Sequence, residues 1–522
     1  MPKPEGGGWK PRYNPWLIAV VVSLAAFMEI LDTSIANVAL PYMAGNLGVT
    51  NDESTWVLTS YLVANAVVLP ISGWLAGVIG RKRYFMGCIL LFTVSSILCG
   101  MAPSLPVLVV ARVLQGACGG GLQPMAQAIL ADSFPPRKRG MAFAAYGLTA
   151  VVAPTVGPTL GGWITDNYSW RWIFFINLPV GALALFLVQR ILEEPPWIKA
   201  RGAGVKVDYL GIALLSLGVG ALQIMLDKGQ EKDWFGSRFI LVLAVVAVVC
   251  LLSLAVWEWF AEHPVIDVRL FKNGNYLTTN LMMFMLGATF FSALVMMPQF
   301  LQTLLGYTAE KAGLVLSARG LMSLLAMPLI GWLTTKVQAR RLVMFGWLAM
   351  AVATRYTAKH LDLLISFRTA SWLGVAQAVG LPFLFIPLTH AAYAGLPEEK
   401  NNAASGMLNF MRNMGSSVGT SFVTTALARR AQFHQVQLAA HDSPYNPLFR
   451  RAAAALGRAM HAAPGASASV YASLYKAVQA QAQTLAYIDT FYLLTAAAAV
   501  MFALSFLLRS NDPAGKAPAG AP

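Results

Sequence analysis

Two carboxylates interrupt an apolar run near the start of the chain. Glu29 and Asp32 lie in the second half of residues 16–40, where most side chains are apolar. A charge near the centre of a bilayer is costly unless it is paired or hydrated, so such a residue usually serves transport or proton relay. An acid that only hydrogen-bonds between helices is the alternative. We favour transport, and we expect Asp32 to couple protons and Glu29 to tune proton coupling or the binding of cationic substrates.

Polar residues around these acids repeat with the period of a helix. Glu29, Thr33 and Asn37 are spaced four residues apart, which brings them to one helical face. Residues 105–131 carry a second polar face, made up of Arg112, Gln115, Gln123 and Gln127. Such faces should point to the interior of a helix bundle, where they form a proton and substrate path or only hold the helices together.

Asp32 and Arg112 are predicted to lie at one depth. If the first helix leaves the membrane near Pro41, Asp32 is about 13 Å below the surface, at a rise of 1.5 Å per residue. If the helix of Arg112 begins near Leu105, Arg112 is about 10 Å below the same surface. The two side chains can therefore meet, as a carrier needs if its carboxylate is loaded outside and discharged inside.

The composition indicates the class of protein that must position these residues. Of 522 residues, 57% are hydrophobic and 12% are charged, and the mean hydropathy is +0.59. These values exclude an ordinary soluble protein and predict an all-α polytopic membrane protein. Fourteen windows can cross a hydrocarbon core of about 30 Å. They are residues 16–41, 54–78, 84–102, 105–131, 141–165, 172–191, 208–226, 238–260, 276–304, 312–335, 342–357, 365–394, 403–428 and 487–508.

Basic residues in short loops indicate the orientation. They cluster on one side of the predicted topology, in residues 81–83, 137–139, 199–206, 269–272 and 336–341, and both termini fall on that side. The positive-inside rule makes this side cytoplasmic. The net charge of +15 is spread over these loops, which favours contact with anionic lipids and not with nucleic acid.

A short internal repeat predicts two halves. PISGWL at residues 70–75 is answered by PLIGWL at residues 328–333, and each precedes a basic loop. Parallel repeats of this kind are typical of transporters with a central site. We expect a six-helix bundle in residues 1–200, an inserted helix pair in residues 201–262 and a second six-helix bundle in residues 263–522.

Other polar and small residues are candidates for the transport path or for movement. Asn409 and Arg412 lie inside the window 403–428, and we expect them to contact substrate. Arg319 and Arg368 are either interior or near helix ends. The fifth window contains Pro154, Gly157, Pro158, Gly161 and Gly162. They predict a kinked, closely packed helix that moves against the other half, or ordinary packing of small residues.

One long segment, residues 429–486, separates the last two windows. Leu448, Ala452, Leu456 and Met460 repeat every fourth residue, and so do Val470, Leu474 and Val478. The pattern predicts two short amphipathic helices, which either lie at the membrane interface or bind a partner.

Motifs for an enzyme are absent from the sequence. It has no phosphate-binding GxxxxGK[ST] loop, no His/Cys metal spacing and no GxSxG elbow, so we expect neither catalysis nor a cofactor or metal. The four cysteines lie in predicted membrane windows and are interpreted as packing residues.

Several of these stretches resemble the major facilitator superfamily. Residues 73–82, GWLAGVIGRK, resemble its pattern G-x-L-a-D-r-x-G-r-k, with Gly73, Gly80 and Arg81 at family positions. Gly77 stands where that pattern has an acid, which puts the usual charge pairing at the inward gate in doubt. Further similarity lies in Arg112, Gln115 and Gly116, in the exporter motif at residues 157–162, and in residues 31–41, which resemble the first helix of fourteen-helix drug:proton antiporters.

Within that superfamily the sequence is similar to the EmrB type of multidrug efflux pump. The similar stretches are residues 172–177, 222–229, 233–235 and 386–389. The resemblance implies proton-driven export of drugs across a bacterial inner membrane, with a periplasmic adaptor and an outer-membrane channel as partners of the outer segment. An apolar bundle with few fixed charges suits amphipathic organic compounds better than sugars. An importer on the same fold and a receptor or scaffold are the alternatives.

Overall fold

The computed structural model describes residues 11–194, 208–262, 264–393, 396–397, 400–440, 446–459 and 467–508. These residues are helical throughout and contain no strand, as the composition predicts. The α-helices are α1 Pro15–Leu47, α2 Asn51–Ser54, α3 Trp56–Ile79, α4 Arg81–Met101, α5 Leu105–Gly119, α6 Leu122–Ser133, α7 Pro136–Asn167, α8 Trp172–Phe175, α9 Asn177–Ile191, α10 Tyr209–Lys228, α11 Arg238–Phe260, α12 Gly274–Leu286, α13 Ser292–Thr303, α14 Ala309–Leu333, α15 Ala339–His360, α16 Phe367–Ala392, α17 Asn401–Ala439, α18 Pro447–Ala459 and α19 Ser467–Leu504. A π-helical turn, η3 Gly287–Phe291, joins α12 to α13.

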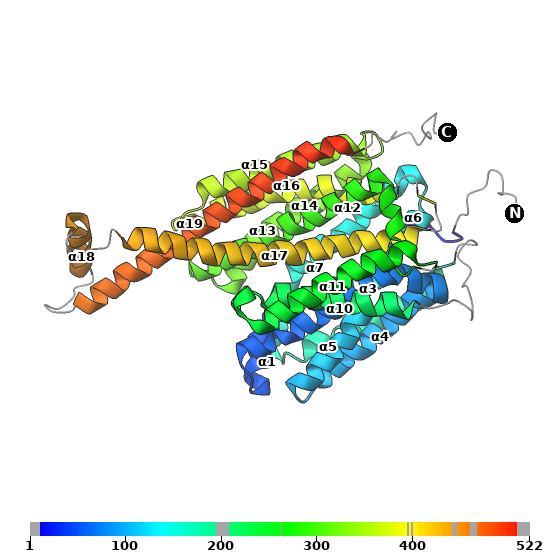
Figure 1. Cartoon of the computed structure of the whole chain (residues 1–522), viewed down its shortest axis with the longest axis horizontal. Coiled ribbons are helices and arrows are strands. Elements are labelled where there is room, and N and C mark those ends of the chain that lie inside the picture. The colour runs from blue at the N-terminus through cyan, green and yellow to red at the C-terminus, as the bar shows by residue number, and fades with distance from the viewer. Residues whose placement is uncertain are drawn as a thin grey trace.

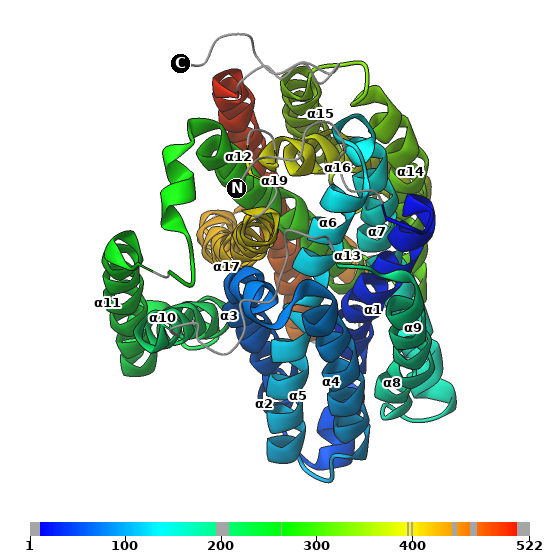
Figure 2. The ribbon, with the colours of Figure 1, turned by 90° about the vertical axis from the view of Figure 1, so that its right-hand side faces the viewer.

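Twelve segments of the described residues are long and apolar enough to cross a membrane. The two predicted windows that are not among them, 342–357 and 403–428, fall in α15 and α17. On α11 the apolar side chains of Phe239, Val249 and Leu252 are exposed, as lipid-facing residues should be. In Figure 2, α10 and α11 lie to one side of the other helices, and α10 contacts α3 and α17.

Two predicted features of the first and fourth windows need correction. The first predicted window, residues 16–41, is shorter than the helix, because α1 continues past Pro41 to Leu47 and ends at Gly48, whose φ is +67°. A proline removes one backbone donor, and a membrane helix can continue past it. The window 105–131 is broken at Gly120 and Gly121 into α5 and α6.

The outer segment also differs from the prediction. The first short helix is present as α18, although Met460 lies outside the described residues. The second is not a separate helix, because Val470, Leu474 and Val478 lie in α19, which continues into the last predicted window. Residues 467–504 contain no glycine or proline to stop the helix.

Helices α17 and α19 extend beyond the other helices, with α18 at their far end (Figure 1). Asp489 on α19 lies 2.8 Å from Arg430 Nε and 2.7 Å from His434 Nε2, both on α17. The Phe449 and Tyr471 rings stack at 5.9 Å and connect α18 to α19. We call the projecting parts of α17 and α19, with α18, the outer stalk.

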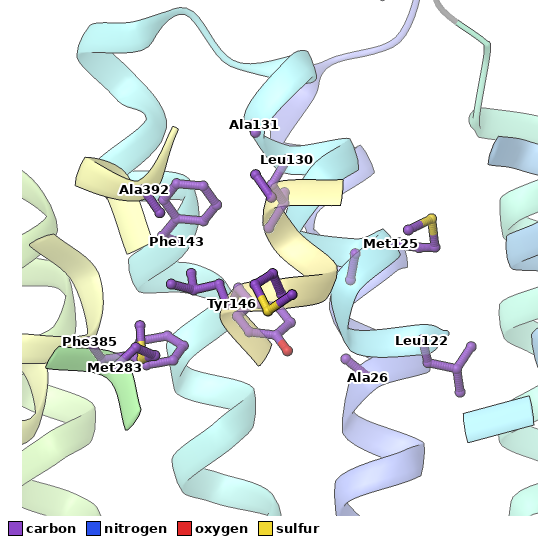
Figure 3. Packing of buried hydrophobic residues seen from close by; sticks show 14 of the residues in the cluster. Ala26, Leu122, Met125, Leu130, Ala131, Phe143, Tyr146, Met283, Phe385 and Ala392 are labelled. Carbon is purple, nitrogen blue, oxygen red and sulfur yellow. The ribbon is translucent and has the colours of Figure 1, made fainter. Parts of the chain in front are cut away.

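In the core, aromatic pairs join α7, in the first predicted half, to α16 and the residue that follows it, in the second. Tyr146 on α7 stacks on Phe385 of α16, with ring centroids 6.4 Å apart. Phe143 stacks in the same way on Tyr393, at 5.5 Å. Figure 3 shows Phe143, Tyr146 and Phe385 between helices of early and late sequence. The two predicted halves therefore share a continuous apolar contact.

The internal repeat corresponds to two close helix contacts. A Cβ added to Gly73 on α3 would lie 2.7 Å from the Ala403 Cα of α17. A Cβ added to Gly331 on α14 would lie 2.6 Å from the Ala144 Cβ of α7. Each repeat therefore brings a glycine against a helix of the other half, where a larger side chain would separate the two helices.

Candidate functional site

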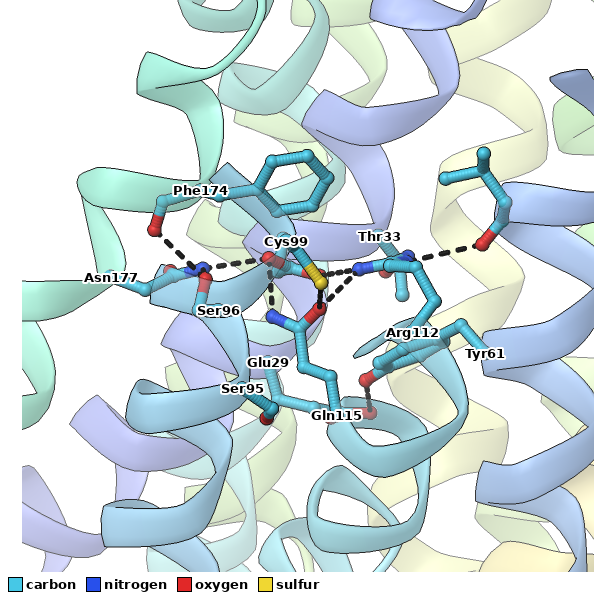
Figure 4. Close-up of polar contacts among 12 residues, drawn as sticks. Glu29, Thr33, Tyr61, Ser95, Ser96, Cys99, Arg112, Gln115, Phe174 and Asn177 are labelled. Carbon is cyan, nitrogen blue, oxygen red and sulfur yellow. Dashed lines mark hydrogen bonds and ion pairs between the residues drawn. The ribbon is translucent and has the colours of Figure 1, made fainter. Parts of the chain in front are cut away.

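A buried polar network surrounds Asp32 on α1. Asp32 is 2% exposed and Arg112, on α5, is 0% exposed. Arg112 Nη1 lies 2.6 Å from Asp32 Oδ2, so the predicted pair is present. Gln115 Nε2 and Asn177 Nδ2 donate to the other carboxylate oxygen at 3.0 and 2.6 Å, as their positions in Figure 4 show. A cation and two amides therefore satisfy this carboxylate.

Further contacts of Arg112 fix its position. Its Nε atom donates to the Val57 carbonyl oxygen at 3.1 Å, and its Nη1 atom donates to Gln115 Oε1 at 2.7 Å. The guanidinium carbon lies 4.3 Å from the centre of the Tyr61 ring. The ion pair is thus held between α1, α3 and α5, although Arg112 Nη2 has no hydrogen-bond partner among the described residues.

Glu29 has a different environment. It is 3% exposed, and it accepts hydrogen bonds from Tyr61 Oη at 3.2 Å, Asn65 Nδ2 at 3.1 Å and Gln123 Nε2 at 2.5 Å. All three donors are neutral. Among the described ion pairs none includes Glu29. The direct hydrogen-bond partners of its carboxylate are therefore all neutral.

The Gln123 side chain connects Glu29 on α1 to α17, which belongs to the second predicted half. Its Oε1 atom accepts a hydrogen bond from Arg412 Nη2, on α17, at 2.5 Å. Tyr146 Oη donates to the same oxygen at 3.4 Å. One amide therefore contacts an acid of α1 at one end and a cation of α17 at the other.

A cavity of about 480 Å³ lies beside this bridge. Glu29, Thr33, Gln123 and Arg412 line it, together with apolar side chains of α12, η3, α14 and α16. Helix α10 of the predicted inserted pair adds Gln223, Leu226 and Asp227, and α17 adds hydroxyls at Ser416, Ser417, Thr420, Ser421 and Thr424. From Arg412 to Thr424 the wall runs about 18 Å along α17.

Other predicted polar residues lie away from the cavity wall. Asp32, Arg112 and Gln115 form the network described above and do not line the cavity. Gln127 and Asn409 pair with each other, with Asn409 Nδ2 donating to Gln127 Oε1 at 2.8 Å and Gln127 Nε2 donating back at 3.3 Å. Asn37 is exposed and is not among the lining residues.

The two predicted halves also meet where α4 and α17 begin and where α6 ends. Arg81 pairs with Asp132 of α6, and Asn401 Nδ2 donates to the other Asp132 oxygen at 2.6 Å. Gly80, with φ +97°, makes the turn that places Arg81 at the start of α4. Nothing lies within 4 Å of a Cβ added to Gly77, the position that departs from the family pattern.

The glycines of α7 fall into two groups. A Cβ on Gly157 would lie 2.3 Å from Ser34 Oγ, and one on Gly161 would lie 2.9 Å from Ile35 Cγ2, both on α1. Gly162 has nothing within 4 Å. Pro154 and Pro158 are both inside the helix, and the Pro154 carbonyl oxygen accepts the Ser34 hydroxyl at 3.5 Å. Close packing of α7 on α1 is therefore local to one face.

Several residues of the site were not predicted from the sequence. Tyr61 and Asn65 lie one helical turn apart in the window 54–78, and that spacing could have indicated them. Asn177 lies in a stretch that resembles the EmrB type but had no assigned role. Asp132 and Asp227 gave no signal, because each depends on which neighbouring helix contacts it.

The fold and sequence both match known transporters. The structure aligns with that of the proton:xylose symporter XylE at a TM-score of 0.63 and 12% identity, over 96% of this chain and 97% of the other. It aligns with the human organic anion transporter MFSD10 at a TM-score of 0.59 and 12% identity, over 93% and 100% of the two chains. At this identity the similarity shows the fold alone.

Several multidrug and fatty acid resistance proteins are more similar to this chain in sequence than these two structures are. The chain is 42% identical to the multidrug export protein EmrB of Haemophilus influenzae over 432 residues, which are 83% of this chain and 84% of the relative. It is 40% identical to EmrB of Escherichia coli over 431 residues, again 83% and 84%. The fatty acid resistance protein FarB of Neisseria gonorrhoeae is 39% identical over 441 residues, 84% and 86%.

The family model of the Major Facilitator Superfamily matches residues 22–420. Together with the apolar helices, these relatives indicate a multi-pass transporter of the inner membrane and not an enzyme. The chain therefore belongs to the Major Facilitator Superfamily and, within it, to the EmrB-type multidrug efflux pumps.

Proposed function

We propose that this protein exports amphipathic organic compounds in exchange for protons, by alternating access. The observation that carries the proposal is the bridge from Glu29 through Gln123 to Arg412 on the cavity wall. A proton or substrate that changes the charge at Glu29 acts directly on an amide held by the opposite half. Binding is thereby coupled to the contact that must change when the halves move.

Asp32, Arg112 and Glu29 are the proposed coupling residues. Glu29 lines the cavity and can exchange a proton with it, whereas Asp32 is enclosed by its partners. Asp32 therefore needs a rearrangement of the Arg112 network before it can be protonated. Gln115 belongs to this network and not to the substrate wall.

Substrate recognition is assigned to Thr33, Gln123 and Arg412, with the apolar wall. Apolar side chains form most of that wall. They include Phe290, Phe291, Met327, Leu62, Leu286, Leu381 and Met414. Few fixed charges and adaptable methionines suit amphipathic compounds of varied shape. The Gln127–Asn409 pair is assigned to closure of the halves.

The alternating movement is proposed to open and close the Asp132 contact. In this arrangement Arg81, Asp132 and Asn401 join the halves on the side that the basic loops make cytoplasmic. The Gly73 contact with α17 closes the same side. Asn401 on α17 supplies a neutral link to Asp132 on α6. This link is proposed to compensate for Gly77, which stands where the family pattern has an acid.

The complete topology has fourteen membrane helices in this proposal. Helices α15 and α17 have 22 and 39 residues, enough to cross about 30 Å of hydrocarbon. The halves are residues 1–200 and 263–522, the inserted pair is residues 201–262, and both termini are cytoplasmic. The two repeat glycines at equivalent close contacts support this division.

The outer stalk is the proposed binding site for a periplasmic adaptor that leads to an outer-membrane channel. It projects beyond the other helices and displays Tyr471 and Tyr475, which are exposed (Figure 1). Replacing Leu456 and Leu474 with Ser should lower resistance of whole cells and leave transport into everted vesicles intact. Equal loss in both assays would mean that the stalk only stabilises the fold.

Export itself is tested in a bacterium that lacks its own drug pumps. Expression of this chain should raise resistance to amphipathic drugs, and an uncoupler should abolish drug accumulation in everted vesicles. The matched pair Glu29→Gln and Asn37→Ala separates a cavity residue from an exposed residue on the same helix. Uncoupler-insensitive export would exclude proton coupling, and uptake in place of export would support an importer.

A further inference from the structure

Arg319 on α14 is a buried cation to which neither the coupling network nor the cavity wall assigns a role. It is 4% exposed. None of its three guanidinium nitrogens has a hydrogen-bond partner among the described residues. It lies about 15 Å from the start of a helix of 25 residues, near the middle of a segment that crosses the membrane. An unpaired guanidinium at this depth is costly, and such residues usually belong to a substrate or ion path.

The surroundings of Arg319 connect it to the cavity. Its guanidinium carbon lies 4.4 Å from the centre of the Phe290 ring, and that ring lines the cavity. Phe290 is part of the π-helical turn η3, a local irregularity that often occurs at functional sites. A Cβ on the neighbouring Gly320 would lie 2.7 Å from Thr155 Oγ1, next to cavity-lining Pro154. One aromatic ring therefore separates this cation from the substrate space.

The contrast with Arg412 shows what Arg319 lacks. Arg412 donates to Gln123 Oε1 and lines the cavity directly. Among the described residues, Arg319 instead lies against the face of the Phe290 ring, which attracts its positive charge. The ring accepts no hydrogen bond from the five N–H groups of the guanidinium, which point outward in the guanidinium plane. A carboxylate matches that fork and would neutralise the charge.

We propose that Arg319 is a binding site for the carboxylate of an amphipathic organic acid, reached from the cavity when the Phe290 side chain turns aside. The proposal rests on the export function above and names one substrate class for it. The acid's apolar chain lies in the cavity among the aromatic and methionine side chains, and its head group binds the guanidinium in two hydrogen bonds.

The test compares two ligands of one chain length and opposite charge, decanoate and decyltrimethylammonium. Their binding to the purified full-length protein is measured without a proton gradient. Arg319→Gln should weaken decanoate binding about tenfold, because two charge-assisted hydrogen bonds are lost, and leave the cation within about twofold. Arg368→Gln, an exposed arginine of the same half, is the matched control and should change neither.

Three outcomes would decide against the site. Equal weakening of both ligands would mean that Arg319 only supports the fold, and unchanged decanoate binding would mean that it contacts no ligand. If chloride in place of gluconate removes decanoate binding, a small inorganic anion occupies the position. Should Arg319→Gln not fold, Arg319→Lys keeps a charge without the fork, and it should retain decanoate preference with weaker affinity. Arg319-dependent binding without export in vesicles would defeat the export function and leave the site standing.

Discussion

Asp32 and Glu29 lie on the same buried face of α1, yet their surroundings differ in kind. Asp32 has a guanidinium and two amides around it and is separated from the cavity. Glu29 has only neutral donors and lines the cavity. The first arrangement holds a charge in place, and the second leaves a charge that a proton or ligand can change at lower cost.

Helix α1 therefore carries a locked acid and an accessible acid less than one turn apart. Tyr61 connects the two acids, because its hydroxyl donates to Glu29 and its ring lies under Arg112, the partner of Asp32. In the proposed mechanism, a change of charge at Glu29 reaches the Asp32–Arg112 pair through this side chain. Variants that affect one acid and not the other can test the distinction.

The largest effect is expected from Asp32→Asn. The variant leaves Arg112 buried without a counter-charge, which should lower the free energy of unfolding by about 3 kcal/mol and abolish proton-driven export. Thermal unfolding in detergent and drug transport in everted vesicles measure the two effects. Combining Asp32→Asn with Arg112→Gln removes both charges. The unfolding temperature should therefore return toward that of the unmodified protein, while export stays absent. Undiminished export in Asp32→Asn would show that this acid does not couple protons.

Glu29→Gln should affect transport more than stability. The new amide keeps an acceptor for Tyr61 and Asn65 but opposes the Gln123 donor, so the free energy of unfolding should change by about 1 kcal/mol. The pH dependence of export, or its preference between cationic and neutral drugs, should shift. Transport assays at several external pH values measure this. A loss of stability as large as that of Asp32→Asn would erase the difference between the two acids.

A glycine pair tests whether both acids move with α7. Gly157→Ala places a Cβ against Ser34 of α1 and should cost about 1–3 kcal/mol through overpacking, with slower export. Gly162→Ala meets no neighbour and is the matched control, since both variants gain the same helix propensity. Vesicle transport rates and unfolding temperatures separate them. Equal behaviour of the two would mean that α1 and α7 do not need this contact.

Tyr61→Phe should have the smallest effect. It removes one hydrogen bond to Glu29 and keeps the ring under Arg112, so the cost is about 0.5–1.5 kcal/mol. Export should persist with a modest change in its pH dependence. Tyr61→Leu also removes the ring and should resemble Asp32→Asn more closely. If the Phe variant loses export completely, the hydroxyl is itself part of the proton path.

Much of the fold could be predicted from the sequence because a bilayer constrains it strongly. Long apolar windows have no stable choice other than helix, so the helices occur where the hydropathy predicts them. The pairing of Asp32 with Arg112 was predictable for the same reason, since a buried charge needs a partner at its own depth. Helix ends were less predictable. Helix α1 continues past Pro41, and α19 begins 20 residues before the last predicted window, at Ser467 and not at residue 487. In neither place does a residue force the helix to end.

The cavity wall could not be predicted from single helices. Asp227 and Gln223 belong to the predicted inserted pair, and their place beside α17 depends on how α10 packs. Asn37 shows the reverse case, because helical spacing puts it in line with Glu29 and Thr33, but it is exposed while Ala36 and Ala39 beside it are buried. A polar repeat indicates a face, and only tertiary packing decides how far that face stays buried.

The unbroken length of α17 has a mechanical consequence. Arg412 at the cavity and Ala439 at the end of the stalk belong to one helix, separated by about 40 Å. In the proposed transport movement, the part of α17 at the substrate wall and its projecting end would therefore move as one rigid piece. Asp489 on α19 pairs with Arg430 and His434 on α17, so the projecting parts of the two helices should move together. A small tilt of α17 around a bound drug is thus magnified at the tip, where a neighbouring protein could sense the occupied cavity.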